Sequence, residues 1–110
     1  MIKALLLMTA LITPAMANDE MMARQARFAF FQKVGIIKRA AAVCGDTDLD
    51  QASVNILNTK EVQEVENTDN IAKAGIIAGV VAFNERLNET GLQFNCDVVK
   101  HLAKQDGYLK

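Results

Sequence analysis

The sequence contains no tryptophan, one proline and one histidine. Its proline, Pro14, lies near the N-terminus, so the following 96 residues contain no proline ring to interrupt a helix. One histidine and two cysteines are too few for the usual zinc ligand sets, and the Cys-x-x-Cys-His motif of covalent haem attachment is absent. Basic and acidic residues number 12 and 13, which excludes the positive excess of a nucleic-acid-binding protein. We therefore expect no cofactor, no metal site and no nucleic-acid partner.

The first seventeen residues have the pattern of a secretory signal peptide. Lys3 supplies a cationic start, residues 4–12 are apolar except Thr9, and residues 15–17 read Ala-Met-Ala, the small-x-small pattern of a cleavage site. The apolar run is too short to cross a bilayer, which takes about 20 residues. We predict cleavage after Ala17, a single mature domain of residues 18–110 without a transmembrane segment, and export to the periplasm or the medium.

Cys44 and Cys96 form an even pair in a small exported domain, which predicts one disulfide. On the chain-entropy model, closing a loop of this length stabilises the fold by about 4 kcal/mol. The alternative is two buried free thiols. The layout of a small exported helical domain with two distant cysteines is similar to that of small periplasmic acid-stress chaperones, and we transfer no residue role from that likeness.

Alanine and straight-chain residues are abundant after the leader, which favours helices over strands. A period of 3.6 residues and polar breaks predict helices over 18–44, 50–57, 60–66, 71–88 and 96–105, with glycines ending three of them. Asn18 and Asn95 are the expected N-caps of the first and last helices. Lys33 interrupts the apolar side of the first helix, and we expect a bend near Gly35. The predicted fold is all-α, a small bundle of four to five helices around a buried central helix, 71–88.

Residues 71–83 are apolar nearly all round, which is typical of a buried helix. Gly75 and Gly79 lie one turn apart within a stripe of alanines, and such a stripe allows close packing of another backbone. This helix could also border a cavity for a small molecule, or its glycines could meet those of a second copy in a homodimer.

Positive charge is concentrated on one side of the first helix. Basic residues interleaved with phenylalanine on a helix face can bind an acidic partner or anionic lipid headgroups. The alternative is that this face packs on the acidic segment 46–66 of the same chain. The candidate partner-binding residues are Arg24, Arg27, Phe28, Phe31, Lys38 and Arg39.

No residue set matches a known catalytic or calcium-binding pattern. The acidic turn at 46–50 lacks the glycine and glutamate that a calcium loop requires at its sixth and twelfth positions. Ser53 and His101 have no nucleophile-elbow or oxyanion-loop motif near them, and His101 remains open as a pH sensor. We therefore expect an exported protein that is not an enzyme and acts by binding another exported protein, as an inhibitor, immunity, chaperone or secretion-accessory protein. A small-molecule carrier is the alternative.

Overall fold

The computed structural model describes the backbone of residues 2–66 and 68–110 and the side chains of residues 19–66 and 68–110. Five helices follow one another along this part of the chain: α1 (Ile2–Cys44), α2 (Thr47–Leu57), α3 (Lys60–Gln63), α4 (Asn70–Thr90) and α5 (Leu92–Gln105). The described residues contain no strand. The predicted all-α bundle is thereby confirmed.

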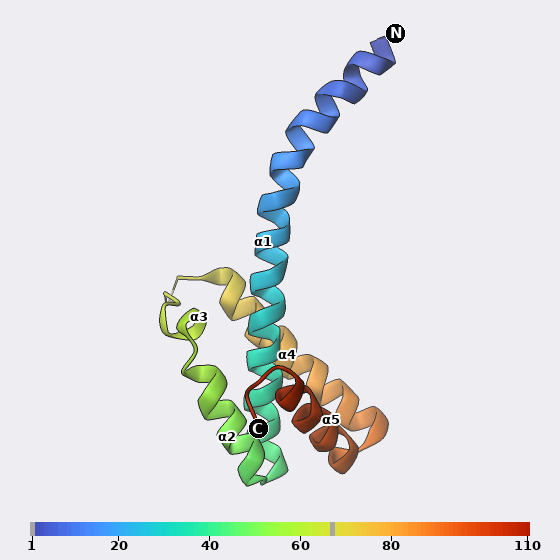
Figure 1. Ribbon diagram of the computed structural model, residues 1–110. Coiled ribbons are helices and arrows are strands. Elements are labelled where there is room, and N and C mark those ends of the chain that lie inside the picture. Colours follow the sequence, from blue (N-terminus) through green and yellow to red (C-terminus); the bar gives the residue numbers. More distant parts are fainter. Residues whose placement is uncertain (1, 67) are drawn as a thin grey trace.

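Helix α1 is the element that organises the bundle. It contacts α2, α4 and α5, and its N-terminal half extends away from the other helices (Figure 1). The core is apolar, as burial of one side of each helix requires. Its residues are Phe31, Val34, Ile37 and Ala40 of α1, Leu49, Ala52 and Ile56 of α2, Ala72 and Phe83 of α4, and Cys96, Val99 and Ala103 of α5.

One local prediction for α1 was wrong. Asn18, the expected N-cap, lies inside the helix, which also continues through Pro14. A proline inside a helix removes one backbone hydrogen bond and can kink the helix without ending it. The side chains of the predicted leader lie outside the described residues. Lys33 forms an ion pair, since its Nζ lies 2.8 Å from Oδ2 of Asp106, and α1 stays helical through Gly35, where the bend remains a prediction.

The expected burial of residues 71–88 on all sides holds for one face of α4 only. Ala72, Gly75, Gly79 and Phe83 are buried, whereas Ile77 on the opposite face is 63% exposed. A long apolar run makes burial on all sides of a helix possible. It does not determine how many other helices will pack against that helix. Here α1, rather than α4, takes the central place.

The glycines of α4 face α1 of the same chain. A methyl group added at Gly75 would lie 2.8 Å from the Phe28 carbonyl oxygen, and one at Gly79 would overlap the Gln32 carbonyl oxygen. Gly35 of α1 approaches the Ile76 backbone in the same way. The stripe therefore supports close helix packing, and it is occupied, which leaves no room there for a second copy of the chain.

The bounds of three helices differ from those predicted, although α3 begins at Lys60 as expected. Helix α2 starts at Thr47 rather than Asp50, because the Asp46 side chain accepts a hydrogen bond from the Asp48 N–H at 2.8 Å. Helix α3 ends at Gln63 rather than Glu66. Helix α5 starts at Leu92 directly after Gly91, whose φ of 89° ends α4.

Asn95 is not an N-cap but a buried residue inside α5, 3% exposed. Its amide Nδ2 donates to the Arg86 carbonyl oxygen at 2.9 Å and to the Thr90 hydroxyl at 2.8 Å, and the Gly91 carbonyl is also within reach. These acceptors lie in the last turn of α4 and in the Gly91 link to α5. Asn95 therefore fastens the start of α5 to the end of α4.

Candidate functional site

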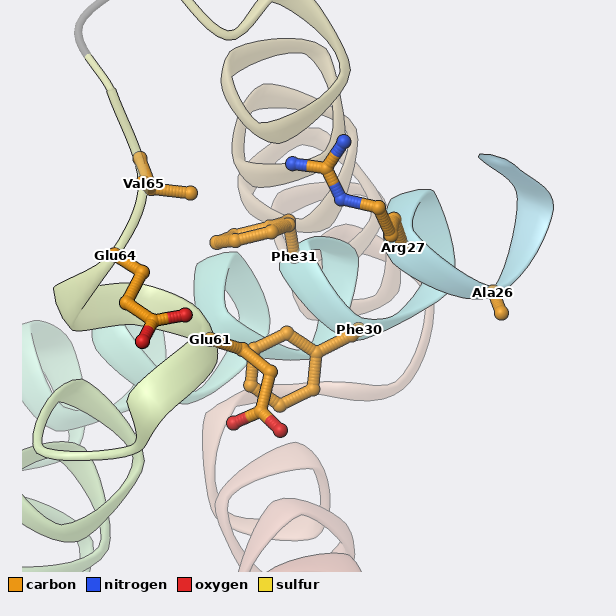
Figure 2. A pocket seen from close by; sticks show the side chains of 7 residues that line it. All are labelled: Ala26, Arg27, Phe30, Phe31, Glu61, Glu64 and Val65. Carbon is orange, nitrogen blue, oxygen red and sulfur yellow. The ribbon is translucent and has the colours of Figure 1, made fainter. Parts of the chain in front are cut away.

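A groove of about 530 Å³ lies between α1 and the segment of α3. Figure 2 shows the two groups of side chains facing each other across it. We call it the α1–α3 groove. Its lining residues are Ala26, Arg27, Phe30 and Phe31 of α1, with Glu61, Glu64 and Val65 from the α3 segment.

The groove exists because α3 packs on α2 and stands away from α1. Within the described residues, α3 has its close backbone neighbours in α2, and none of its residues is fully buried. Val62 and Val65 pack only partly against the core. A four-residue helix covers too little of α1 to close the gap, so the apolar side of α1 stays open here.

Two phenylalanines form the apolar floor of the groove. The rings of Phe30 and Phe31 meet edge to face with centroids 5.3 Å apart, an arrangement that aromatic pairs favour. Phe31 is 2% exposed and belongs to the core, and Val65 points toward it from the α3 segment, while Phe30 is half-buried beside Glu61 (Figure 2). The floor can therefore accept one or two apolar side chains.

The rim of the groove carries two exposed carboxylates, of which only Glu64 is in an ion pair, and that pair is long and exposed. Glu61 and Glu64 are exposed, and the nearest cation to Glu64 is Lys60 at 3.8 Å, one turn away on the same surface helix. No ion pair joins Glu61 to another residue whose side chain is described. Exposed pairs of this kind contribute little, so both carboxylates can bind an incoming cation.

Arg27, the basic residue at the groove, is already engaged. Its guanidinium pairs with the Asp69 carboxylate, which also accepts a hydrogen bond from the Ala72 N–H at 3.0 Å and caps α4. The Ala72 N–H, followed by the Arg27 guanidinium, lowers the pKa of Asp69 from its usual range. The charge that the groove offers to a partner is therefore that of Glu61 and Glu64.

The residues of the predicted basic-aromatic face of α1 do not form one continuous surface in the structure. Helix α4 packs along part of this side of α1, while Arg27 and Phe31 lie opposite Glu61, Glu64 and Val65 of the acidic segment. Phe31 is 2% exposed and belongs to the core, and Phe28 is 36% exposed. Only Arg27 and Phe31 of the six predicted residues also line the groove.

The remaining basic residues of that face mostly have partners. Arg24 pairs with Glu20 at 2.8 Å, and Nε of Arg39 donates to Oδ1 of Asn84 at 3.1 Å. Lys38 is exposed. The charge of this face is therefore partly neutralised within the chain.

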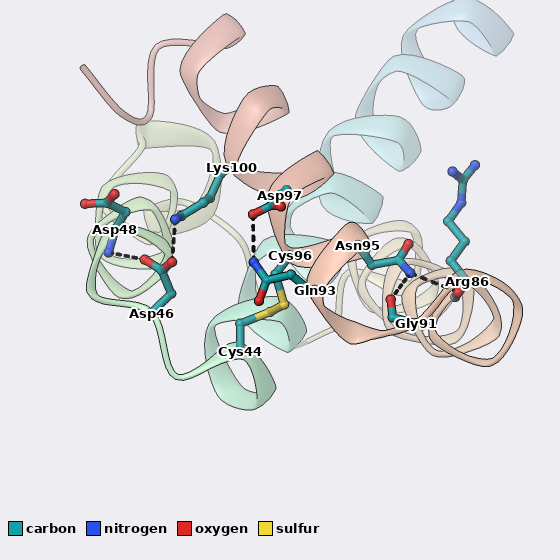
Figure 3. Close-up of a disulfide and its surroundings, with 10 residues drawn as sticks. All are labelled: Cys44, Asp46, Asp48, Arg86, Gly91, Gln93, Asn95, Cys96, Asp97 and Lys100. Atoms are coloured by element: carbon teal, nitrogen blue, oxygen red, sulfur yellow. Dashed lines mark hydrogen bonds and ion pairs between the residues drawn. A yellow bond between two sulfur atoms is a disulfide. The ribbon is translucent and has the colours of Figure 1, made fainter.

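The opposite end of the bundle is closed by the predicted disulfide. Cys44 and Cys96 are bonded, with Cα atoms 6.0 Å apart, and join the end of α1 to α5. Nζ of Lys100 lies 2.5 Å from Oδ2 of Asp46 beside this bond (Figure 3). The hydrogen bond from Lys100 lowers the pKa of Asp46, and the same contact raises the pKa of Lys100.

Other sequence candidates are not assembled into a site. His101 is exposed on α5, Ser53 is half-buried on α2, and no hydrogen bond joins them in the described part of the chain. No cluster of three potential metal ligands occurs among the described residues. No helix within them has both the length and the hydrophobicity to cross a membrane.

Fold and groove together define a small, disulfide-linked, all-α protein with an open, acidic-rimmed groove beside its longest helix. No protein family model matches the chain, and neither the curated proteins nor the solved structures contain a significant match. The function must therefore be argued from the groove.

The sequence did not indicate this groove. Glu61 and Glu64 stand three residues apart on a predicted helix, so a shared acidic face could have been noticed. Their position opposite Phe30 depends on how α3 is held by α2, and no local pattern contains that information.

Proposed function

We propose that this protein is an exported, non-catalytic binding protein that holds a segment of another exported protein in the α1–α3 groove. The observation that carries the proposal is the combination of an apolar floor, Phe30 and Val65, with the exposed carboxylates of Glu61 and Glu64. Binding sites commonly combine an apolar surface with a few polar groups that orient the partner. The leader pattern and the disulfide support export.

The groove also suggests the chemistry of the bound segment. An apolar side chain would cover Phe30, and a lysine or arginine next to it would pair with Glu61 or Glu64. A helix with apolar residues one turn apart and a basic flank presents such a combination. The proposal therefore differs from the acidic partner suggested by the basic residues of α1, whose charges are partly satisfied within the chain.

A small-molecule carrier has less support. The hollow beside α4 measures about 180 Å³, and a second of about 170 Å³ lies between α1 and α5; they share Gln32, Ile36, Val99 and Leu102 as lining residues. Ligand sites usually measure about 300 to 1,000 Å³. Native mass spectrometry of the purified protein would reveal a retained ligand as a discrete added mass, and such a result would favour the carrier.

The test of the proposal is a comparative pull-down from an extract of exported proteins. The baits are the wild type, the charge-reversed variant Glu61→Lys/Glu64→Lys, and a matched control, Arg24→Gln/Lys38→Gln, altered on the basic face. We expect at least one protein to be retained by the wild type and the control and lost from the Glu variant, with affinity reduced at least about tenfold. Equal recovery on all three baits, or no recovery, would contradict the proposal.

A further inference from the structure

The hollow of about 180 Å³ beside α4 is lined by three helices, and we call it the α4–α5 pocket. It shares no lining residue with the α1–α3 groove, so it is a separate feature of the surface. Its lining includes Gln32 and Ile36 of α1, Arg86 of α4, and Asn95, Val98 and Leu102 of α5.

The Asn95 side chain brings an unpaired hydrogen-bond acceptor to this pocket. Its Nδ2 faces three oxygen atoms, the carbonyls of Arg86 and Gly91 and the hydroxyl of Thr90. Reversing the amide would set its Oδ1 against two carbonyl oxygens, so the orientation is fixed. No donor among the described residues bonds to Oδ1. In Figure 3 this oxygen points away from Gly91, toward the side on which the Arg86 guanidinium lies.

The burial of Asn95 directs this oxygen into the pocket. The residue is only 3% exposed, yet every fully buried nitrogen or oxygen atom of a described side chain has a hydrogen-bond partner. Because Oδ1 has no partner, it must lie at an accessible surface, and the α4–α5 pocket is the hollow that Asn95 lines. An apolar group that filled the pocket would leave this acceptor without water or donor, which is unfavourable.

Two further polar groups line the pocket, the Gln32 amide and the Arg86 guanidinium. No ion pair joins Arg86 to another side chain in the described part of the chain. The other walls are apolar, with Ile36 and Val98 half-buried and Leu102 41% exposed. The pocket therefore combines apolar walls with one acceptor, one amide and one cation.

The volume of the pocket suits a single aromatic ring. A protein cavity of about 150 Å³ holds benzene, whereas ligand sites of the usual kind begin at about 300 Å³. At about 180 Å³ the α4–α5 pocket has room for one ring with a small substituent. The unpaired oxygen requires that this substituent be a hydrogen-bond donor.

We propose that the α4–α5 pocket receives a tyrosine side chain of another protein, with an acidic residue of the same segment beside Arg86. The ring would contact Ile36 and Leu102. Its hydroxyl would donate to Oδ1 of Asn95 and accept from the Gln32 amide. Tyrosine joins a ring to a group that both donates and accepts, whereas phenylalanine lacks a donor and the tryptophan N–H only donates.

The surface around the pocket favours a polypeptide over a free phenol. Phe94, Val98 and Leu102 follow one another at intervals of four residues, so they lie along one side of α5. Phe94 is 59% exposed, and a single ring in the pocket cannot cover this strip. Protein interfaces typically anchor an aromatic side chain in a pocket and surround it with further contacts.

This surface does not rest on the proposed function of the α1–α3 groove. The groove offers carboxylates to a basic segment, whereas the α4–α5 pocket offers an arginine to an acidic one. Variants at Leu102 and at Glu61 and Glu64 therefore test the two surfaces separately.

The first test titrates isotope-labelled protein with p-cresol and with toluene, which differ only in the hydroxyl group. By NMR we expect p-cresol to shift the amide signals of residues 98–102 with a millimolar dissociation constant. Toluene should bind several-fold more weakly, because it leaves Oδ1 of Asn95 unpaired. Leu102→Lys should abolish these shifts, and Lys104→Gln, an exposed change on the same helix, should not. Equal or tighter binding of toluene, or shifts confined to residues 26–31 and 61–65, would overturn the proposal.

The second test selects peptides from a displayed random library on the immobilised protein. We expect the enriched peptides to contain a tyrosine with an aspartate or glutamate nearby, and to bind at least about tenfold more tightly than p-cresol. Replacing that tyrosine with phenylalanine should weaken binding at least about tenfold. Arg86→Gln should weaken it several-fold, and Glu61→Lys/Glu64→Lys should leave it unchanged. Enrichment without tyrosine, p-cresol binding as tightly as the peptides, or loss of binding to the Glu variant would overturn the proposal.

Discussion

Arg27 and Asp69 join the first helix to the start of the fourth across 42 positions of sequence. The Asp69 carboxylate also caps α4 through the Ala72 N–H. One carboxylate thus starts a helix and holds it against α1, and removing it should weaken two connections at once.

Substitutions at Asp69 can separate these two roles. The amide of the Asp69→Asn variant would still accept a hydrogen bond and cap α4, whereas it would lose the ion pair with Arg27. We therefore expect Asp69→Ala to be less stable than Asp69→Asn, and both less stable than the wild type at pH 7. Urea unfolding monitored by circular dichroism gives the order. Glu89→Gln, which removes an exposed acid, is the control, and equal stability of the two Asp69 variants would contradict the capping role.

The free energy of unfolding should decrease as the pH falls below about 4, because the carboxylates of Asp69 and Asp46 become protonated. Both carboxyls have lower pKa values in the folded chain than the value of about 3.9 of a free aspartate. Between the folded and unfolded pKa values, the unfolded chain therefore binds more protons than the folded chain. The two carboxylates stabilise the fold fully above about pH 4, and this stabilisation is lost as the pH falls through their folded-state pKa. Thermal unfolding from about pH 2 to 7 should show a shallower acid decline for Asp46→Asn/Asp69→Asn than for the wild type. An identical decline would contradict the assignment.

Gly79→Ala should destabilise the protein although alanine favours helices by about 1 kcal/mol. The added methyl group would overlap the Gln32 carbonyl oxygen of α1, so the helices must separate. We expect a net loss of about 1 to 3 kcal/mol in the free energy of unfolding. Ala74→Gly, on the exposed side of the same helix, should lose only about 1 kcal/mol from helix propensity. A Gly79→Ala variant as stable as the wild type would show that α1 and α4 are not in close contact.

Substitution of Asn95 should lower the stability of the fold, because its amide donates hydrogen bonds at the end of α4. Asn95→Ala removes the hydrogen bonds of this amide, while the Arg86 carbonyl oxygen still accepts from the Thr90 hydroxyl, and we expect a loss of about 1 kcal/mol in the free energy of unfolding. Asn95→Asp should lose more, since a carboxylate would face the same oxygen atoms without a proton to donate. Chemical denaturation provides the comparison, with the exposed Gln93→Ala expected to change stability by less than about 0.5 kcal/mol. Asn95→Asp more stable than Asn95→Ala would contradict the hydrogen-bond assignment.

Removal of the disulfide should lower the free energy of unfolding by about 4 kcal/mol. The bond closes a loop between cysteines 52 positions apart, and without it the unfolded chain has more conformational entropy. The measurement compares urea unfolding of the wild type with Cys44→Ala/Cys96→Ala. The Asp46–Lys100 ion pair, which joins the N-cap of α2 to α5, remains in this variant. A loss below about 1 kcal/mol would mean that the cross-link does little to restrict the unfolded chain.

Much of the fold was predictable because its causes are local. The helical periods of segments 18–44, 71–88 and 96–105, the glycine stops and the cysteine pairing all follow from nearby residues and from the compartment. The starts of the helices were less predictable. Asp46 and Asp69 are the N-caps of α2 and α4, whereas Asn95 is a buried residue inside α5. Several neighbouring polar residues could have capped each helix, and the packing of the helices determines which one does.

The α1–α3 groove was not predictable at all. Phe30 and Glu61 are 31 positions apart, and their side chains line one hollow only because α2 carries α3 past α1 at a distance. The same reasoning applies to the basic residues of α1. Their spacing correctly places them on one side of a helix, but it cannot show that α4 will pack on that side.

The amino-acid sequence alone determined the all-α class, the main helical spans and the Cys44–Cys96 bond, because periodicity and helix propensity act over a few residues. Only the tertiary structure decided that α1 is central, that α4 is buried on one face, and that an acidic-rimmed groove opens beside α3. The physical reason is that a helix face can pack against any complementary face. The choice among them is made by contacts between residues far apart in the chain.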